Sequence, residues 1–144
     1  MAKVKERGYS DKYLMKLWRD KVLHECIHSC VICGMSDQVS ELECHHFVHR
    51  NHYLLRYDWR NGFPVCKYRN HEYDNGKGMS CHRYADTPAG REVIESIIKK
   101  RGQWDYIKTI GFQKKADFLL GRGISELEFL KEIKHDLTGN QVED

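Results

Sequence analysis

The closely spaced cysteine pair in the segment CVICG at residues 30–34 limits most strongly how this chain can fold. Two intervening residues let both thiolates point at one ion, and the glycine relieves the tight turn that follows. The chain has six cysteines and nine histidines in 144 residues. Its first residues are charged and contain no apolar run, so we expect no secretory signal and a reducing, cytoplasmic compartment. We therefore interpret the cysteine spacing as a metal site rather than a disulfide.

A closed structural zinc site needs four ligands, and two later cysteines are the natural second pair. The segment between that pair, residues 67–80, is polar and rich in turn residues, so we interpret it as a loop inserted into an ordinary zinc knuckle. A shifted site that uses Cys26 stays open, although a buried helical thiol explains that cysteine equally simply. A redox pair would need a thioredoxin-like βαβ context, which the sequence lacks. The predicted structural zinc ligands are Cys30, Cys33, Cys66 and Cys81.

The composition predicts one domain with a modest core, because hydrophobic residues make up 40% of the chain. No apolar run approaches the roughly 20 residues of a membrane span, so we expect no membrane contact. The net charge is only +3, so nucleic-acid binding would depend on local basic clusters. A solvated helix face is the alternative interpretation of each cluster. The clusters are Lys12, Lys16, Arg19 and Lys21; Lys67 and Arg69; and Lys99, Lys100 and Arg101.

The residue pattern predicts a single domain, 1–144, in which helices flank a middle zone. Ser10 is a suitable N-cap for the first helix, and Thr87 followed by Pro88 marks the start of another. Apolar residues at helical spacing predict a further helix from Ser125 to Leu137. We expect these helices to pack and to position the middle zone. The predicted parts are an N-terminal helix at 10–28, a zinc-stapled core at 29–86, C-terminal helices at 87–137 and a flexible tail at 138–144.

Two adjacent histidines, His45 and His46, lie between the two halves of the knuckle. Neighbouring side chains on a strand project to opposite faces, so one histidine can bind a metal while the other faces a substrate water. A metal-bound imidazole, a free imidazole and a nearby amide are the parts that metal-assisted phosphodiester hydrolysis needs. Asn61 offers the amide, and His82 follows the last cysteine of the knuckle.

This order of motifs resembles the HNH (ββα-metal) endonuclease superfamily. Within it, the runs CVICG, HHFVHR and RYDWRNGFPVC are most similar to the NinG (Rap) recombination nucleases of lambdoid phages. The resemblance covers about residues 29–137, and its most specific part is RYDWRN at residues 56–61. It implies an α+β fold, in which a ββα-metal (HNH) core is stapled by a structural zinc knuckle and flanked by N-terminal and C-terminal helices. The chain departs from the pattern in two ways. Segment 67–80 is inserted between the last two cysteines, and the residue before the predicted base is also a histidine, His45, as in colicin-type nucleases.

The resemblance also implies a role for each matched residue. His46 would be the general base, and Asn61 would hydrogen-bond across the loop between the strands and keep the His46 ring oriented. His45 would be the first ligand of a catalytic metal. His82 would be the second ligand, because it follows the presumed zinc cysteine, and His71 is the alternative. So sparse a ligand set suits Mg²⁺ or Mn²⁺ and also admits Ni²⁺ or Zn²⁺.

Three arginines surround these motifs, and an arginine guanidinium suits phosphate because its fork is planar and bidentate. Arg56 is our choice for a contact to phosphate or to the transition state. For Arg60 the alternative is a structural ion pair with Asp58; the third arginine is Arg50. The nearby aromatic residues, which could stack on an unpaired base or pack under the hairpin, are Tyr53, Tyr57 and Trp59. Two further histidines, which could be recruited to the site or lie on the surface, are His49 and His52.

The expected function is a metal-dependent endonuclease that hydrolyses DNA phosphodiester bonds. We expect its DNA to be a branched or single-stranded intermediate of phage recombination or replication in the cytoplasm of a bacterial host. Cutting both strands of a junction would suit a homodimer. One alternative is a non-catalytic zinc module that binds DNA or protein, but such a module has no need of His46 together with Asn61. A redox or metal-storage protein is another alternative, and it would need reactive Cys30 and Cys33.

Overall fold

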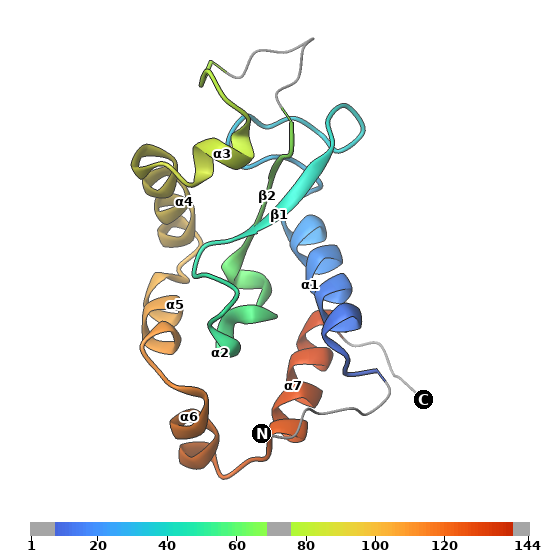
Figure 1. Cartoon of the computed structure of the whole chain (residues 1–144), viewed down its shortest axis with the longest axis vertical. Helices are drawn as coiled ribbons and strands as arrows, with labels where there is room; N and C mark the ends of the chain where they lie inside the picture. The colour runs from blue at the N-terminus through green and yellow to red at the C-terminus, as the bar shows by residue number, and fades with distance from the viewer. Residues whose placement is uncertain (1–7, 69–75, 140–144) are drawn as a thin grey trace.

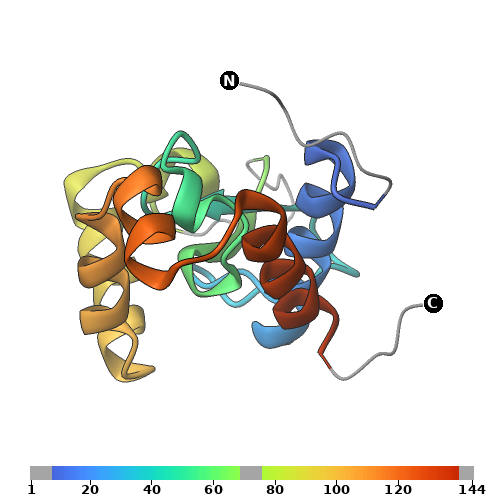
Figure 2. The ribbon, with the colours of Figure 1, turned by 90° about the horizontal axis from the view of Figure 1, so that it is seen from below.

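The computed structural model describes residues 8–68 and 76–139. Within these ranges the chain is a mixed α+β fold with a two-stranded antiparallel sheet. Helix α1 packs on one side of this hairpin and contacts α7, and α3, α4 and α5 lie on the other side (Figures 1 and 2). None of the helices in these ranges is long and apolar enough to cross a membrane. The elements are α1 (Asp11–Glu25), β1 (Leu42–His46), α2 (Tyr53–Arg56), η1 (Trp59–Asn61), β2 (Gly62–Cys66), α3 (Cys81–Ala85), α4 (Pro88–Lys100), α5 (Trp104–Gly111), α6 (Lys115–Arg122) and α7 (Glu126–Thr138).

The helix starts that the sequence predicted are confirmed. The Ser10 hydroxyl accepts a hydrogen bond from the backbone of the first turn of α1, and Thr87 caps α4 in the same way, with Pro88 at the first helical position. A capping box formed by Ser125 and Glu128 starts α7. These caps satisfy amide groups that the first turn of a helix leaves without partners.

The helix ends differ from the prediction in two places. The first helix stops at Glu25 rather than at residue 28, because Ile27 and His28 take left-handed φ angles of 56° and 50° and turn the chain toward the cysteines. A β-branched residue rarely adopts this conformation. The predicted helical zone at 87–137 is divided into four helices, and Gly102 and Gly123, both at positive φ, separate α4 from α5 and α6 from α7.

The hairpin pairs β1 with β2 in antiparallel register, with Leu42 opposite Cys66 and His46 opposite Gly62. All five residues of β2 are buried. A Cβ atom on Gly62 would lie 2.4 Å from a Val22 methyl carbon and 2.6 Å from the Trp18 ring, so α1 can approach the strand this closely only over a glycine. This contact places the end of β1 directly beside α1.

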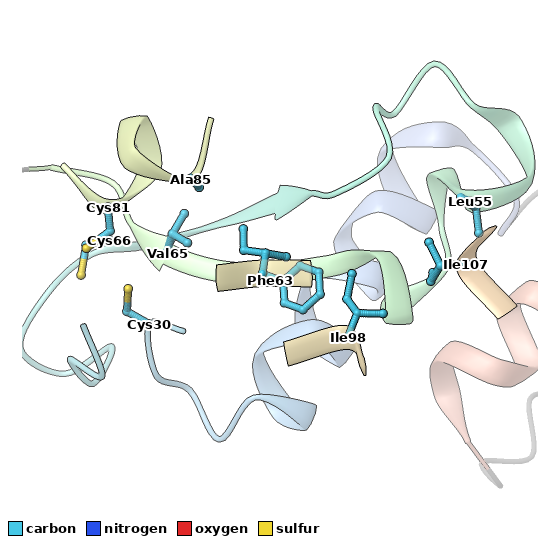
Figure 3. Close-up of a cluster of buried hydrophobic side chains, with 10 residues drawn as sticks. Cys30, Leu55, Phe63, Val65, Cys66, Cys81, Ala85, Ile98 and Ile107 are labelled. Atoms are coloured by element: carbon cyan, nitrogen blue, oxygen red, sulfur yellow. The ribbon is translucent and has the colours of Figure 1, made fainter. Parts of the chain in front are cut away.

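Two apolar clusters hold the hairpin between its helical layers. One lies between β2 and helices α3, α4 and α5, with Phe63 and Val65 at its centre and Leu55 and Ile107 at the end away from the cysteines (Figure 3). The other joins α1 to α7. A two-stranded hairpin is at best marginally stable alone, so burial on both faces is what keeps β1 and β2 in place. The α1–α7 cluster includes Leu14, Trp18, Val22, Phe129, Leu130, Ile133 and Leu137.

Candidate zinc and catalytic sites

The four predicted cysteines come together as a candidate zinc site. The sulfur atoms of Cys30, Cys33, Cys66 and Cys81 all lie within 4.8 Å of one another, and those of Cys33 and Cys66 are 3.5 Å apart. Tetrahedral zinc with bonds of about 2.3 Å holds its sulfur ligands about 3.8 Å apart, so the cluster fits this ion. Figure 3 shows Cys30, Cys66 and Cys81 gathered at one end of the apolar cluster.

The backbone around Cys30 forms the knuckle that the spacing predicted. The Gly34 amide donates to the Cys30 carbonyl at 2.8 Å, and Gly34 has a φ of 81°. The amides of Ile32 and Cys33 point at the Cys30 sulfur, at 3.4 and 3.5 Å. Burial raises the pKa of Cys30, but these amides and others outweigh it and leave the pKa below its usual value. The knuckle thus favours a thiolate, which is the form that binds metal.

The two remaining cysteines lie outside this cluster. Arg101 donates to the Cys26 sulfur at 3.1 Å, so the structure gives no support to the shifted site that would use Cys26. The Cys44 thiol lies 3.7 Å from the Arg19 carbonyl, and burial raises the Cys44 pKa to about 12. Neither thiol is placed to complete the four-cysteine set.

His46, the predicted base, is held on two sides. Its Nε2 atom lies 2.8 Å from the Arg56 carbonyl, and its ring stacks on Trp18 with centroids 4.0 Å apart and planes 5° from parallel. A carbonyl oxygen can only accept, so Nε2 carries the proton and the neutral ring has its lone pair on Nδ1. Burial lowers the pKa of His46 to about 4, against the opposing effect of the bond to Arg56.

His45, the predicted metal ligand, faces the other way, toward α3. Its Nε2 atom lies 3.2 Å from a carboxylate oxygen of Asp86, and its ring meets that of His82 edge to face, with centroids 5.5 Å apart. His82 Nε2 lies 3.9 Å from a carboxylate oxygen of Glu43. Burial lowers the pKa of His45, and the Asp86 carboxylate opposes that effect. Two imidazoles and two carboxylates therefore gather between β1 and α3.

Asp86 and Glu43 were not predicted as site residues from the sequence. Both obey simple spacing: Glu43 is two residues before His45 on one strand face, and Asp86 is one helical turn after His82. The grouping can be recognised only when Cys81 is known to start α3, because that start turns His82 and Asp86 toward β1. We name this group of Glu43, His45, His82 and Asp86 the histidine–carboxylate cluster.

The histidine–carboxylate cluster is less compact than the cysteine site. Within the described part of the chain, the four cysteines are the one group of at least three potential ligands whose atoms all lie within 4.8 Å of one another. The donors of the second cluster approach in pairs, His45 with Asp86 and His82 with Glu43. The Asp86 side chain is 61% exposed and that of His45 only 15%, so the cluster opens on its carboxylate side. The alternative ligand His71 lies outside the described residues.

Asn61 is fully buried, and its side-chain amide hydrogen-bonds to the backbone of the segment between β1 and β2. Its side-chain oxygen accepts from the Val48 amide at 2.7 Å, and its side-chain nitrogen donates to the carbonyls of Val48 and Leu55 at 2.9 and 3.2 Å. These bonds hold the segment whose next residue, Arg56, presents its carbonyl to His46. Asn61 thus acts on His46 through the backbone, and its amide bonds to the loop rather than to the ring.

Arg56, the predicted phosphate contact, already has a carboxylate partner. Its guanidinium lies 2.7 Å from a carboxylate oxygen of Asp11, which also accepts from the Tyr57 hydroxyl at 2.6 Å. A phosphate would have to compete with Asp11 for this side chain. Arg60 forms the predicted ion pair, with bonds of 3.2 and 3.1 Å to the two oxygens of buried Asp58.

Other predicted contacts also have structural partners. The Tyr53 hydroxyl donates to Glu126 and the Tyr53 ring packs on Phe129. Tyr53 therefore links α7 to the segment between β1 and β2. Three lysines of the basic clusters pair with acidic residues one helical turn away. Those pairs are Lys16 with Asp20, Lys21 with Glu25 and Lys99 with Glu95. Exposed Arg91, which was not predicted as a site residue, donates to the Phe47 carbonyl at 3.2 Å.

The structure thus brings two neighbouring clusters together where α3 meets the hairpin, because Cys81 belongs to one and the next residue, His82, belongs to the other. The cysteine cluster suits a structural zinc ion, and the histidine–carboxylate cluster lies beside a histidine whose Nδ1 lone pair is available to a proton. No protein-family model matches the chain, and searches of curated proteins and of solved structures found no match either.

Proposed function

We propose that this chain is a metal-dependent DNA endonuclease of the HNH (ββα-metal) type, as its resemblance to the NinG (Rap) nucleases implies. The observation that carries the proposal is the placement of two adjacent histidines at the end of β1. His46 has its proton on Nε2 and its lone pair on Nδ1, and His45 faces the carboxylate of Asp86. A packing or purely zinc-binding role requires neither arrangement.

The donor set of the histidine–carboxylate cluster fits a divalent cation. Two imidazole nitrogens favour borderline metals, while two carboxylates favour harder ones, so the mixed set suits Mn²⁺ better than Mg²⁺ and also admits Ni²⁺ or Zn²⁺. A cation held by His45, His82 and Asp86 would supply Lewis-acid stabilisation of the scissile phosphate and of the leaving 3′ oxygen. Glu43 is placed to orient His82 or to bind the cation directly.

The remaining chemistry belongs to protein side chains. His46 would accept a proton at Nδ1 from the attacking water, while the Arg56 carbonyl and the Trp18 ring keep the imidazole in one orientation. Because His45 and His46 face opposite sides of β1, we place the scissile phosphate across the end of the strand, where both imidazoles can reach it. Exposed Arg50 and Arg91 are available to attract the DNA backbone there.

The zinc knuckle would position the metal ligand as well as stabilise the fold. Cys81 is the first residue of α3 and His82 is the second. A zinc ion that binds Cys81 therefore fixes the start of α3 and, with it, the approach of His82 to β1. This link explains why the cysteine site lies next to the proposed catalytic site.

A cleavage assay tests the proposal. The zinc-loaded chain would be incubated with supercoiled plasmid, circular single-stranded DNA and a four-way junction, each with Mg²⁺, Mn²⁺, Ni²⁺ or EDTA. We expect cleavage of at least one DNA form with Mn²⁺, none with EDTA, and products that carry 5′-phosphate ends. Absence of cutting in every combination would refute the proposal, and DNA binding without cutting would favour a non-catalytic zinc module.

A further inference from the structure

A pocket of about 380 Å³ lies beside the proposed catalytic site. It is formed by the residues that directly follow β1, by α4 and by α5. This volume is within the range of about 300–1,000 Å³ that small-molecule sites occupy. Its principal lining residues are Phe47, Val48, Arg91, Trp104, Lys108 and Phe112.

Aromatic rings and cations lie close together in this pocket. Phe47 and Trp104 meet edge to face with centroids 6.0 Å apart, and the Arg91 guanidinium lies 4.4 Å from the Phe47 ring centroid. The Lys108 ammonium lies 5.3 Å from the centroids of both Trp104 and Phe112. The Phe112 residue is 81% exposed, although it is large and apolar. Rings on the wall and cations at the rim are the surface that single-stranded nucleic acids bind, by stacking of bases and by attraction of phosphates.

Two carboxylates, Glu92 and Glu95, also line the pocket. They would repel a phosphate from its interior, but each can accept hydrogen bonds from the amino group of a base. The charge pattern therefore favours a base inside the pocket with its phosphates at the cationic rim. A base stacked within a duplex cannot enter such a pocket without leaving the stack.

The pocket adjoins the catalytic site through two residues. Phe47 follows His46 in the chain, and Arg91 on α4 donates to the Phe47 carbonyl at 3.2 Å. A strand whose phosphate lies across the end of β1 would thus have a neighbouring base at the pocket mouth.

We propose that this pocket binds an unpaired nucleobase of the strand to be cut, and that the preferred substrate is DNA that is single-stranded next to the scissile phosphate. This inference deepens the proposed function and rests on it for the position of the phosphate. It assigns base stacking to Trp104 and Phe112, rather than to Tyr53, Tyr57 and Trp59 between the two strands.

The test measures binding rather than cleavage. A short single-stranded oligodeoxynucleotide that carries 2-aminopurine is titrated with the zinc-loaded chain, without added divalent metal, and a blunt duplex is titrated in parallel. Phe112→Ser should weaken binding of the single strand by about tenfold and reduce the quenching of 2-aminopurine, because it deletes one of the two stacking rings. Binding of the duplex should stay within about twofold of the wild-type value.

Two variants control this experiment. Phe112→Tyr keeps the ring and should behave as wild type. Leu120→Ser removes a large apolar side chain that is 83% exposed on α6, outside the pocket lining, and should also behave as wild type. The inference is overturned if Phe112→Ser binds the single strand normally, if it weakens the duplex equally, or if Leu120→Ser has the same effect. A chain that shows the expected pattern but cuts no DNA would support the pocket and refute only the nuclease.

Discussion

Cys81→Ser should unfold this protein or lower its melting temperature by at least about 15 °C. Cys81 is buried, belongs to the four-sulfur cluster and begins α3. A serine cannot replace the thiolate as a zinc ligand, and structural zinc contributes an apparent 10–16 kcal/mol, roughly, in zinc-finger peptides. That contribution is comparable with the whole stability of an ordinary domain, which is about 5–15 kcal/mol. Thermal unfolding followed by circular dichroism, with the zinc content of each sample, checks this result.

Cys26→Ser is the matched control for the zinc prediction. Cys26 lies outside the cluster and contacts Arg101, and a serine oxygen can still accept that hydrogen bond. This variant should keep about one zinc ion per chain and melt close to wild type. The zinc assignment is wrong if Cys81→Ser melts like wild type without zinc, or if Cys26→Ser loses the metal as readily.

His46→Gln should reduce the rate of DNA cleavage by about a thousandfold, within the range that general-base catalysis contributes. Glutamine can still donate to the Arg56 carbonyl and fills much of the space beside Trp18, but it has no group that takes a proton from water. Zinc content and melting temperature should therefore stay near the wild-type values. The measurement is the initial rate of nicking of the DNA form that wild type cuts best, under the same metal concentration.

His49→Ala controls for a general effect of removing a histidine near the site. His49 is exposed, and its Nδ1 atom accepts a local hydrogen bond from the Asn51 amide, at 3.1 Å. We expect this variant to cut within a few-fold of wild type. A His46→Gln protein that cuts as fast as His49→Ala would show that His46 is not the base.

Local patterns explain which parts of the structure could be predicted. The four cysteines and the helix caps follow from spacing and from the chemistry of single residues, and the structure confirms that they cluster and cap as expected. The Arg60–Asp58 pair joins residues two apart, so the sequence could offer it as an alternative. The break between α4 and α5 at Gly102 was missed, because the positive φ angle of a glycine is set by how the helices pack.

Contacts between distant segments explain what could not be predicted. The phosphate contact of Arg56 stays a prediction, and the sequence could not show that the Arg56 guanidinium also pairs with Asp11, near the N-terminal end of the described chain. Asp86 and Glu43 join the candidate metal site only because α3 packs against the hairpin, and the pocket exists only because α4 and α5 flank the residues after β1. Such packing depends on the whole fold, and no short motif encodes it.

Anomalous diffraction from crystals of the zinc-loaded chain soaked in Mn²⁺ tests the central claim most directly. Data collected at the zinc and manganese absorption edges locate each metal separately. We predict zinc among Cys30, Cys33, Cys66 and Cys81, and manganese bound to His45, His82 and Asp86, on the side of β1 opposite the Trp18–His46 stack. Manganese bound elsewhere, or by His71 in place of His82, or absent from the histidine–carboxylate cluster at saturating concentration, would contradict this assignment of the catalytic centre.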